Sequence, residues 1–187
     1  MNDTPYTRRF FGLILDLLIV ISLFFGVILV VRAFGLYFPL VEFLDADRPT
    51  MLRVFIYFAG FYLFYELFFS ALLMTTPGKI LVNVEDEYYR GHTFINVVLR
   101  CLIKTITVVL GPFTIAVSLA VAVVRKSGQS IHDLAARTRV TEETRSPRLI
   151  GLFFAAAALA LTIYFYYAVL KGQVFDFAKL NIPTLYG

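Results

Sequence analysis

The sequence predicts an all-α integral membrane protein: a small helical bundle with a re-entrant or broken third helix and a short cytoplasmic β-hairpin. Of its 187 residues, 59% are hydrophobic and only 16% are charged, whereas about a quarter of a soluble domain is charged. The apolar residues form long runs, and a Gly-Pro pair interrupts one of them. This length leaves no room for a separate soluble enzyme domain beside such a bundle.

Two long apolar runs in the first half of the chain predict membrane-spanning helices. The first extends from Phe10 to Val31 and the second from about Met51 to Thr75. The 22 residues of the first run would rise about 33 Å as a helix, enough to cross a hydrocarbon core about 30 Å thick. The aromatic loop between them, from Arg32 to Thr50, is expected to rest on the membrane surface.

A turn signal follows the second run, formed by Thr76, Pro77, Gly78 and Lys79. Pro-Gly pairs favour turns, and Lys79 is expected to anchor this one at the membrane interface. Apolar and polar residues then alternate, followed by an acidic stretch and a polar end at Gly91. This alternation predicts a small surface hairpin between Ile80 and Gly91.

The region from Phe94 to Val124 admits two interpretations, a kinked crossing or a helical hairpin that returns to the same side. After Gly111-Pro112, only about 12 apolar residues remain, which rise about 18 Å and do not cross alone. A hairpin places 12 of the 17 Lys and Arg residues on one side and 5 on the other, whereas a crossing divides them 8 and 9. The positive-inside rule therefore favours the hairpin, with a cytoplasmic N-terminus.

The C-terminal part combines a short helix signal with a last span. Ser130 and Asp133 have the spacing of an N-cap and the third helical residue, so a short amphipathic helix is expected, ending before Pro147. The run from Leu149 to Leu170 predicts another crossing, with an external tail after it. We expect a membrane domain over residues 1–140 and an additional transmembrane helix with a short tail over residues 141–187.

Two carboxylates, Asp16 and Glu66, lie inside the predicted spans. A charge within a membrane segment is costly and raises a functional question. Arg9 precedes Asp16 by seven residues, about 10.5 Å of helix, too far for direct neutralisation. Asp16 is therefore expected to face Glu66 or the basic stripe that contains Arg100 and Lys104. Two interpretations stay open: a site for a proton or small cation, or a buried network that fixes helix packing.

Two further polar features also have alternative interpretations. The stripe of Asn96, Arg100 and Lys104 has the charge that anionic lipid headgroups attract. Asp133 is placed either to cap its own helix or to pair with Arg9 across the cytoplasmic mouth of the bundle.

Three motifs occur in a set order along the chain: Arg9 with Asp16, then Thr76 to Lys79, then His132-Asp133-Leu134-Ala135. Together they resemble the RDD family of membrane proteins, named for one arginine and two aspartates. The resemblance covers about Arg8 to Val140 and implies that the family residues here are Arg9, Asp16 and Asp133. The family usually has a small residue where Arg137 stands, and the last helix lies outside the shared region.

The resemblance implies a multi-pass protein of the bacterial cytoplasmic membrane that takes part in transport of ions or small solutes. Cation/proton exchange has been suggested for some members of the family. The alternative is a non-catalytic accessory, scaffold or assembly subunit of a larger membrane complex. The residues expected to form the transport site or polar network are Arg9, Asp16, Glu66, Arg100, Lys104 and Asp133.

The sequence holds no catalytic constellation. His92 and His132 are its only histidines and lack metal-ligand spacing, so we expect no enzyme activity, metal or cofactor. The net charge of +4 reflects basic residues beside apolar runs, which does not indicate nucleic-acid binding. The expected partners are the lipid bilayer, including anionic lipid, and other membrane subunits or a second copy. The lone Cys101 excludes an intrachain disulfide.

Overall fold

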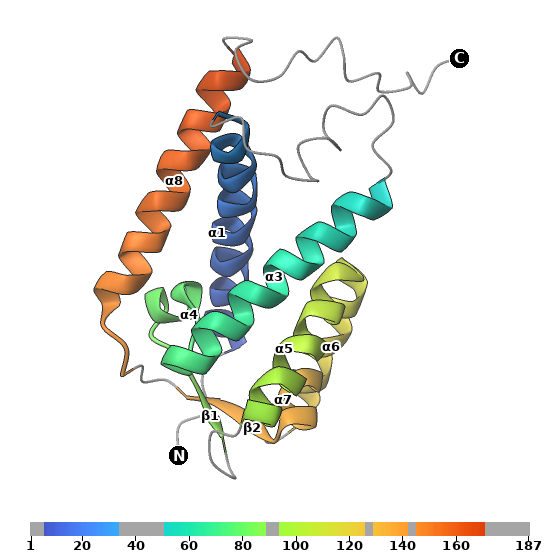
Figure 1. Cartoon of the computed structure of the whole chain (residues 1–187). Helices are drawn as coiled ribbons and strands as arrows, with labels where there is room; N and C mark the ends of the chain where they lie inside the picture. The colour runs from blue at the N-terminus through green and yellow to red at the C-terminus, as the bar shows by residue number, and fades with distance from the viewer. Residues whose placement is uncertain (1–5, 34–50, 89–93, 126–128, 142–144, 171–187) are drawn as a thin grey trace.

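The described parts of the chain form a helical bundle with one two-stranded sheet at its base (Figure 1). The computed structural model describes residues 6–33, 51–88, 94–125, 129–141 and 145–170. Within them, three helices are long and apolar enough to cross a membrane: α1 (Tyr6–Ala33), α3 (Met51–Leu73) and α8 (Arg148–Leu170). The predicted fold class and its three long spans are confirmed. Most of the predicted surface loop, residues 89–91 of the predicted hairpin and the C-terminal tail lie outside the described residues.

Helices α1 and α8 run in the same direction along each other, and α3 crosses beside them (Figure 1). A Cβ atom on Gly26 would lie 2.7 Å from Leu161 Cδ1, so a larger residue there would require the Leu161 side chain to shift. One turn away, the hydroxyls of Ser22 and Thr162 share a 2.8 Å hydrogen bond. The helix that follows the expected membrane domain is therefore packed closely against the first helix of that domain.

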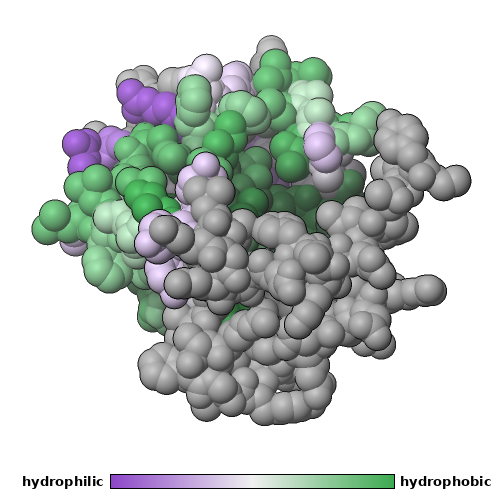
Figure 2. Space-filling model, turned by 90° about the horizontal axis from the view of Figure 1, so that it is seen from above, coloured by the Kyte–Doolittle hydropathy of each residue, from purple (hydrophilic) through white to green (hydrophobic). Residues whose placement is uncertain are grey.

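The outer surface of the bundle is apolar. Phe64, Leu72 and Phe153 are each about two-thirds exposed, and hydrophobic residues dominate the described surface seen from above (Figure 2). Patches of this extent on a soluble protein would be an interaction or aggregation site. On a membrane protein they face acyl chains, and the buried contacts of Val20, Tyr62 and Phe69 form the core.

The turn predicted after α3 is the start of a short helix, α4 (Pro77–Leu81). Pro77 occupies the first turn, where its fixed φ suits a helix and its missing N–H costs nothing. The alternation predicted from Ile80 is wrong over these residues, because Ile80 is helical and fully buried. Asn83 then adopts a left-handed turn with φ of 58°, and the strand β1 (Glu85–Tyr88) begins two residues later.

The strand β1 pairs with a strand that is distant in sequence. Its antiparallel partner is β2 (Thr138–Thr141), with Asp86 opposite Val140. The predicted local hairpin is therefore wrong in its pairing, although the chain does form a small two-stranded sheet. Alternation along one strand does not reveal which strand pairs with it. Here the helices between the two strands return the chain so that β2 lies beside β1.

Those intervening helices form the hairpin that charge counting favoured. Helix α5 (Phe94–Val109) and helix α6 (Pro112–Val124) meet at Gly111, whose φ of 97° requires glycine. Helix α7 (Ile131–Ala136) then packs against α5, and β2 follows it. Because β1 precedes α5 and β2 follows α7, their pairing returns the chain to the end of the bundle that it left. The region is a hairpin rather than a crossing.

This arrangement predicts the labelling of single cysteines introduced on a Cys101→Ala background. Cysteines at the exposed positions Arg8 and Arg125 should react with an impermeant maleimide from the same side of sealed vesicles, because both lie at the sheet end of the bundle. A cysteine at exposed Tyr166, near the far end of α8, serves as the control and should react from the opposite side. Labelling of Arg8→Cys and Arg125→Cys from opposite sides would contradict the hairpin.

Candidate functional site: a buried ion-pair network

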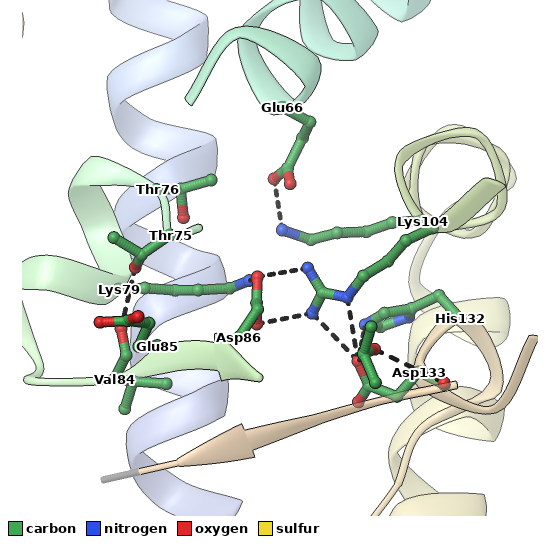
Figure 3. A network of polar contacts seen from close by, with 12 residues as sticks. Glu66, Thr75, Thr76, Lys79, Val84, Glu85, Asp86, Lys104, His132 and Asp133 are labelled. Carbon is green, nitrogen blue, oxygen red and sulfur yellow. Dashed lines mark hydrogen bonds and ion pairs between the residues drawn. The ribbon is translucent and has the colours of Figure 1, made fainter. Parts of the chain in front are cut away.

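Eight charged side chains form a network at the sheet end of the bundle, and Figure 3 shows part of it, including Glu66, Lys79, Asp86, Lys104 and Asp133. The seven other than Arg9 are at most 7% exposed, and the Arg9 side chain is 12% exposed. The carboxylates are Asp16, Glu66, Asp86 and Asp133, and the cations are Arg9, Lys79, Arg100 and Lys104. Equal numbers of both signs make such burial tolerable, since an unpaired buried charge costs several kcal/mol.

The guanidinium of Arg100 lies at the centre of this network and binds two carboxylates. Its Nη1 and Nη2 donate to the two oxygens of Asp86, the second at 2.8 Å. Its Nε and Nη2 donate to Oδ1 of Asp133 at 3.1 and 3.0 Å. Lys79 Nζ donates to the same Asp86 at 2.6 Å. One side chain of α5 therefore connects β1, α4 and α7.

Both roles predicted for Asp133 are present in the geometry. Its Oδ2 accepts hydrogen bonds from the hydroxyl and the backbone N–H of Ser130, at 2.7 and 3.2 Å, which caps α7. Arg9 Nη1 lies 4.0 Å from the same oxygen, and Arg9 Nη2 donates to Val140 O at 3.2 Å. Asp133 and Arg9 therefore connect the start of α1 to α7 and β2.

The carboxylate of Asp16 is bound by hydrogen-bond donors rather than by a cation. Tyr65 Oη donates to Oδ1 at 2.8 Å, and Thr76 Oγ1 donates to Oδ2 at 2.5 Å. The backbone N–H of Gly78, in the first turn of α4, donates to Oδ1 at 2.8 Å. A Cβ on Gly78 would lie 2.6 Å from Asp16 N and from Gly12 O. The Thr-Pro-Gly motif is therefore a cradle for Asp16.

Glu66 is paired with Lys104 through one of its two oxygens. Lys104 Nζ and Tyr62 Oη both donate to Oε1, the latter at 3.0 Å. Oε2 is buried and has no hydrogen-bond partner among the described residues. Asp16 and Glu66 accept hydrogen bonds from different donors, so the two carboxylates share no hydrogen-bond donor.

Two predicted surface roles are wrong. Lys79 does not anchor a turn at the membrane interface but points inward to Asp86, and Arg100 and Lys104 are buried rather than open to headgroups. Sequence reasoning also missed the role of Asp86. The signal was available, because Asp86 alternates with Val84, just before β1, and with Tyr88 at the end of β1, and all three are buried.

A cavity of about 90 Å³ lies beside the network, between α1, α5, α6 and α7. Lys104 and Arg100 line one side of it, and apolar side chains line the other. No group of three His, Cys, Asp or Glu residues suited to a metal ion occurs among the described residues.

The fold and the network together define a helical membrane protein in which four carboxylates and four cations are gathered at one end of the bundle. Its sequence matches the model of the RDD family over residues 4–137, and the chain belongs to this family. No curated protein and no solved structure gives a significant match. The three residues that the resemblance assigns to the family motif, Arg9, Asp16 and Asp133, all lie in the network. Arg137, at the position where the resemblance expects a small residue, has a left-handed φ of 54°.

We expect Asp16→Asn to lower the free energy of unfolding by about 3 kcal/mol, because a carboxamide offers one acceptor oxygen to three donors. The matched control is Glu87→Gln, which changes a carboxylate that is 49% exposed and pairs with Arg139 on the sheet. The control should cost less than about 1 kcal/mol. Chemical unfolding in detergent would measure both, and equal losses would contradict the cradle.

His132 makes stability depend on pH. Burial lowers its pKa to about 4, and the charges of Arg100, Lys104 and Lys79 act in the same direction against the attraction of Asp133. Burial opposes ionisation of Asp133, but His132, Arg100 and the Ser130 hydrogen bond hold its pKa below its usual range. The folded protein therefore prefers a neutral imidazole, whereas the unfolded chain takes up a proton near pH 6.5.

The contribution of neutral His132 should be complete above about pH 6.5 and decline as the pH falls toward 4. The melting temperature of the wild type should consequently fall more steeply between pH 7 and pH 5 than that of His132→Asn. Parallel pH profiles for the two proteins would show that the imidazole is not held neutral.

Proposed function

We propose that the protein takes part in the transport of a proton or a small monovalent cation, with Glu66 as the exchanging carboxylate and Lys104 as its counter-charge. The observation that carries the proposal is the buried Oε2 of Glu66, which has no hydrogen-bond partner among the described residues although its neighbour Oε1 accepts two hydrogen bonds. A carboxylate oxygen in this state is an acceptor for a proton or a cation.

The contrast with Asp16 supports the choice of Glu66. Asp16 accepts three hydrogen bonds that fix α1 to α3 and α4, so releasing its charge would disturb the packing. Glu66 is held by only two side chains, Tyr62 and Lys104, of which the lysine is flexible. Lys104 also lines the cavity, which gives its side chain a space into which to move when the carboxylate takes up a proton or a cation. Exchange at Glu66 thus requires movement of side chains rather than of helices.

The test is pH- or cation-dependent flux in proteoliposomes. Glu66→Gln should reduce flux at least tenfold, whereas Glu87→Gln on the exposed face of the sheet should leave it unchanged. The melting temperature of each variant shows whether the fold is retained. Unchanged flux through a folded Glu66→Gln variant would overturn the proposal.

A second candidate is an accessory subunit of a larger membrane complex, and the surface of α8 favours it. This helix contacts the bundle along a narrow face and leaves Leu152, Phe153, Leu159 and Tyr166 exposed. Absence of flux in the wild type, together with a stable complex of defined mass after gentle extraction, would support this function over transport.

A further inference from the structure

The exposed cations that the structure describes at the sheet end of the bundle are all arginines, and they lie outside the buried network. The lysines whose side chains are described are both buried. A guanidinium differs from an ammonium because it binds a phosphate through two parallel N–H groups. The exposed cations are therefore of the type that suits phosphate, and they are Arg8, Arg125, Arg137, Arg145 and Arg148.

Two of these arginines, Arg8 and Arg148, lie where a helix begins its apolar span. Arg8 is in the first turn of α1, and Arg148 is the first residue of α8. Both helices are long and apolar enough to cross a membrane, and the neighbouring side chains of Phe11 and Leu149 are 57% and 76% exposed. A charge at such a boundary lies at the depth of the lipid headgroups, with acyl chains beside it.

The short helix α4 lies between the starts of α1 and α8 (Figure 1). Glycines permit its close contact with both helices. A Cβ atom on Gly12 of α1 would lie 3.2 Å from Val82 Cγ2, at the end of α4. A Cβ atom on Gly151 of α8 would lie 2.9 Å from Pro77 O, at the beginning of α4.

These contacts place the two arginines on either side of α4. Arg8 precedes Gly12 by four residues, and Arg148 precedes Gly151 by three. Residues three or four apart lie on the same face of a helix, so each arginine is one turn closer to the sheet end than the glycine that contacts α4. Arg8 and Arg148 therefore flank one part of the surface, although 140 residues separate them in the chain.

The charges of this pair are not neutralised by the described parts of the protein. Neither first turn contains an acidic residue. Arg8 and Arg148 form no ion pair with another described residue, and Glu87, an exposed acid of the sheet, pairs with Arg139. Two cations at headgroup depth without an acid favour an anion from outside the chain.

We propose that Arg8 and Arg148 bind the phosphate of an anionic phospholipid whose acyl chains lie along the exposed apolar faces of α1 and α8. A phospholipid fits both parts of this surface, because its phosphate meets the arginines and its chains cover Phe11 and Leu149. Binding does not require ion exchange at Glu66. Its failure and the failure of the transport proposal are therefore distinguishable, since one is measured by lipid retention and the other by flux.

Native mass spectrometry of the full-length protein tests the proposal. The protein is released from mixed micelles that contain phosphatidylglycerol and phosphatidylcholine with identical acyl chains. We expect the wild type to retain phosphatidylglycerol in preference to phosphatidylcholine. The double variant Arg8→Gln/Arg148→Gln should weaken this retention at least fivefold.

The matched control is the double variant Arg125→Gln/Arg137→Gln. It removes the same charge from the same end of the bundle, but from exposed positions outside α1 and α8. Retention should change less than twofold in this control. The melting temperature of each double variant shows whether its fold is retained.

A phosphatidylglycerol with a diazirine in its headgroup locates the site in the wild type, so this measurement does not depend on the folding of a variant. We expect labelled peptides from the starts of α1 and α8. Unlabelled phosphatidylglycerol should compete, whereas inorganic phosphate at the same ionic strength should not.

The proposal would be overturned by equal retention of the two lipids, by equal losses in the two folded double variants, or by labelling confined to other helices. Displacement by inorganic phosphate would also overturn it, because the ligand would then be a soluble anion. Selective loss in Arg8→Gln/Arg148→Gln, together with labelling at the starts of α1 and α8, would support it.

Discussion

The burial of Arg100 is the constraint on which the sheet end of the bundle depends. A guanidinium cannot lose its charge in a protein, so its removal from water requires acceptors in fixed positions. Asp86 and Asp133 supply them from two segments that lie on either side of the α5–α6 hairpin in sequence. The pairing of β1 with β2 brings those segments together. The sheet, the short helix α7 and the orientation of α5 thus all place acceptors around the buried guanidinium of Arg100.

The two intramembrane carboxylates show two different ways of keeping a charge in a helical bundle. Asp16 is stabilised by neutral donors from a tyrosine, a threonine and a backbone amide. Glu66 depends on a lysine and a tyrosine, which contact only one of its oxygens. The first arrangement is rigid because a helix end supplies part of it, and the second is adjustable because the lysine has a long, flexible side chain.

The sequence predicted the elements that depend on composition and left undetermined those that depend on pairing. The long spans are evident because lipid demands about 20 apolar residues in a row, and Gly111-Pro112 marked the break between α5 and α6. The partner of β1 could not be predicted, because three helices, α5, α6 and α7, separate β2 from β1 in the chain. Lys79 was predicted to lie at the membrane interface because its neighbours indicate a turn. Its side chain points inward instead, because it donates a hydrogen bond to Asp86.

The sequence indicated most residues of the network one by one, as charges in or beside apolar runs, but their pairing was only partly predicted. The hypothesis of Arg9 beside Asp133 followed from the predicted ends of two helices, and the 4.0 Å separation places these residues together. The donors of Asp16 were not predicted, because a hydrogen bond from Thr76 or Gly78 leaves no charge pattern in the sequence. Neutral hydrogen-bond donors are therefore harder to predict from a sequence than ion pairs.

The order in which the chain is synthesised gives the Asp16 cradle a further consequence. Thr76 follows Asp16 by 60 residues, so at about 5–20 residues per second the first helix waits about 3–12 seconds for its last donors. During that interval a carboxylate has entered, or is entering, the bilayer without the groups that later satisfy it. The strong hydrophobicity of the first helix outweighs this cost on insertion, and the final surroundings of Asp16 are complete only when α3 and α4 have been made.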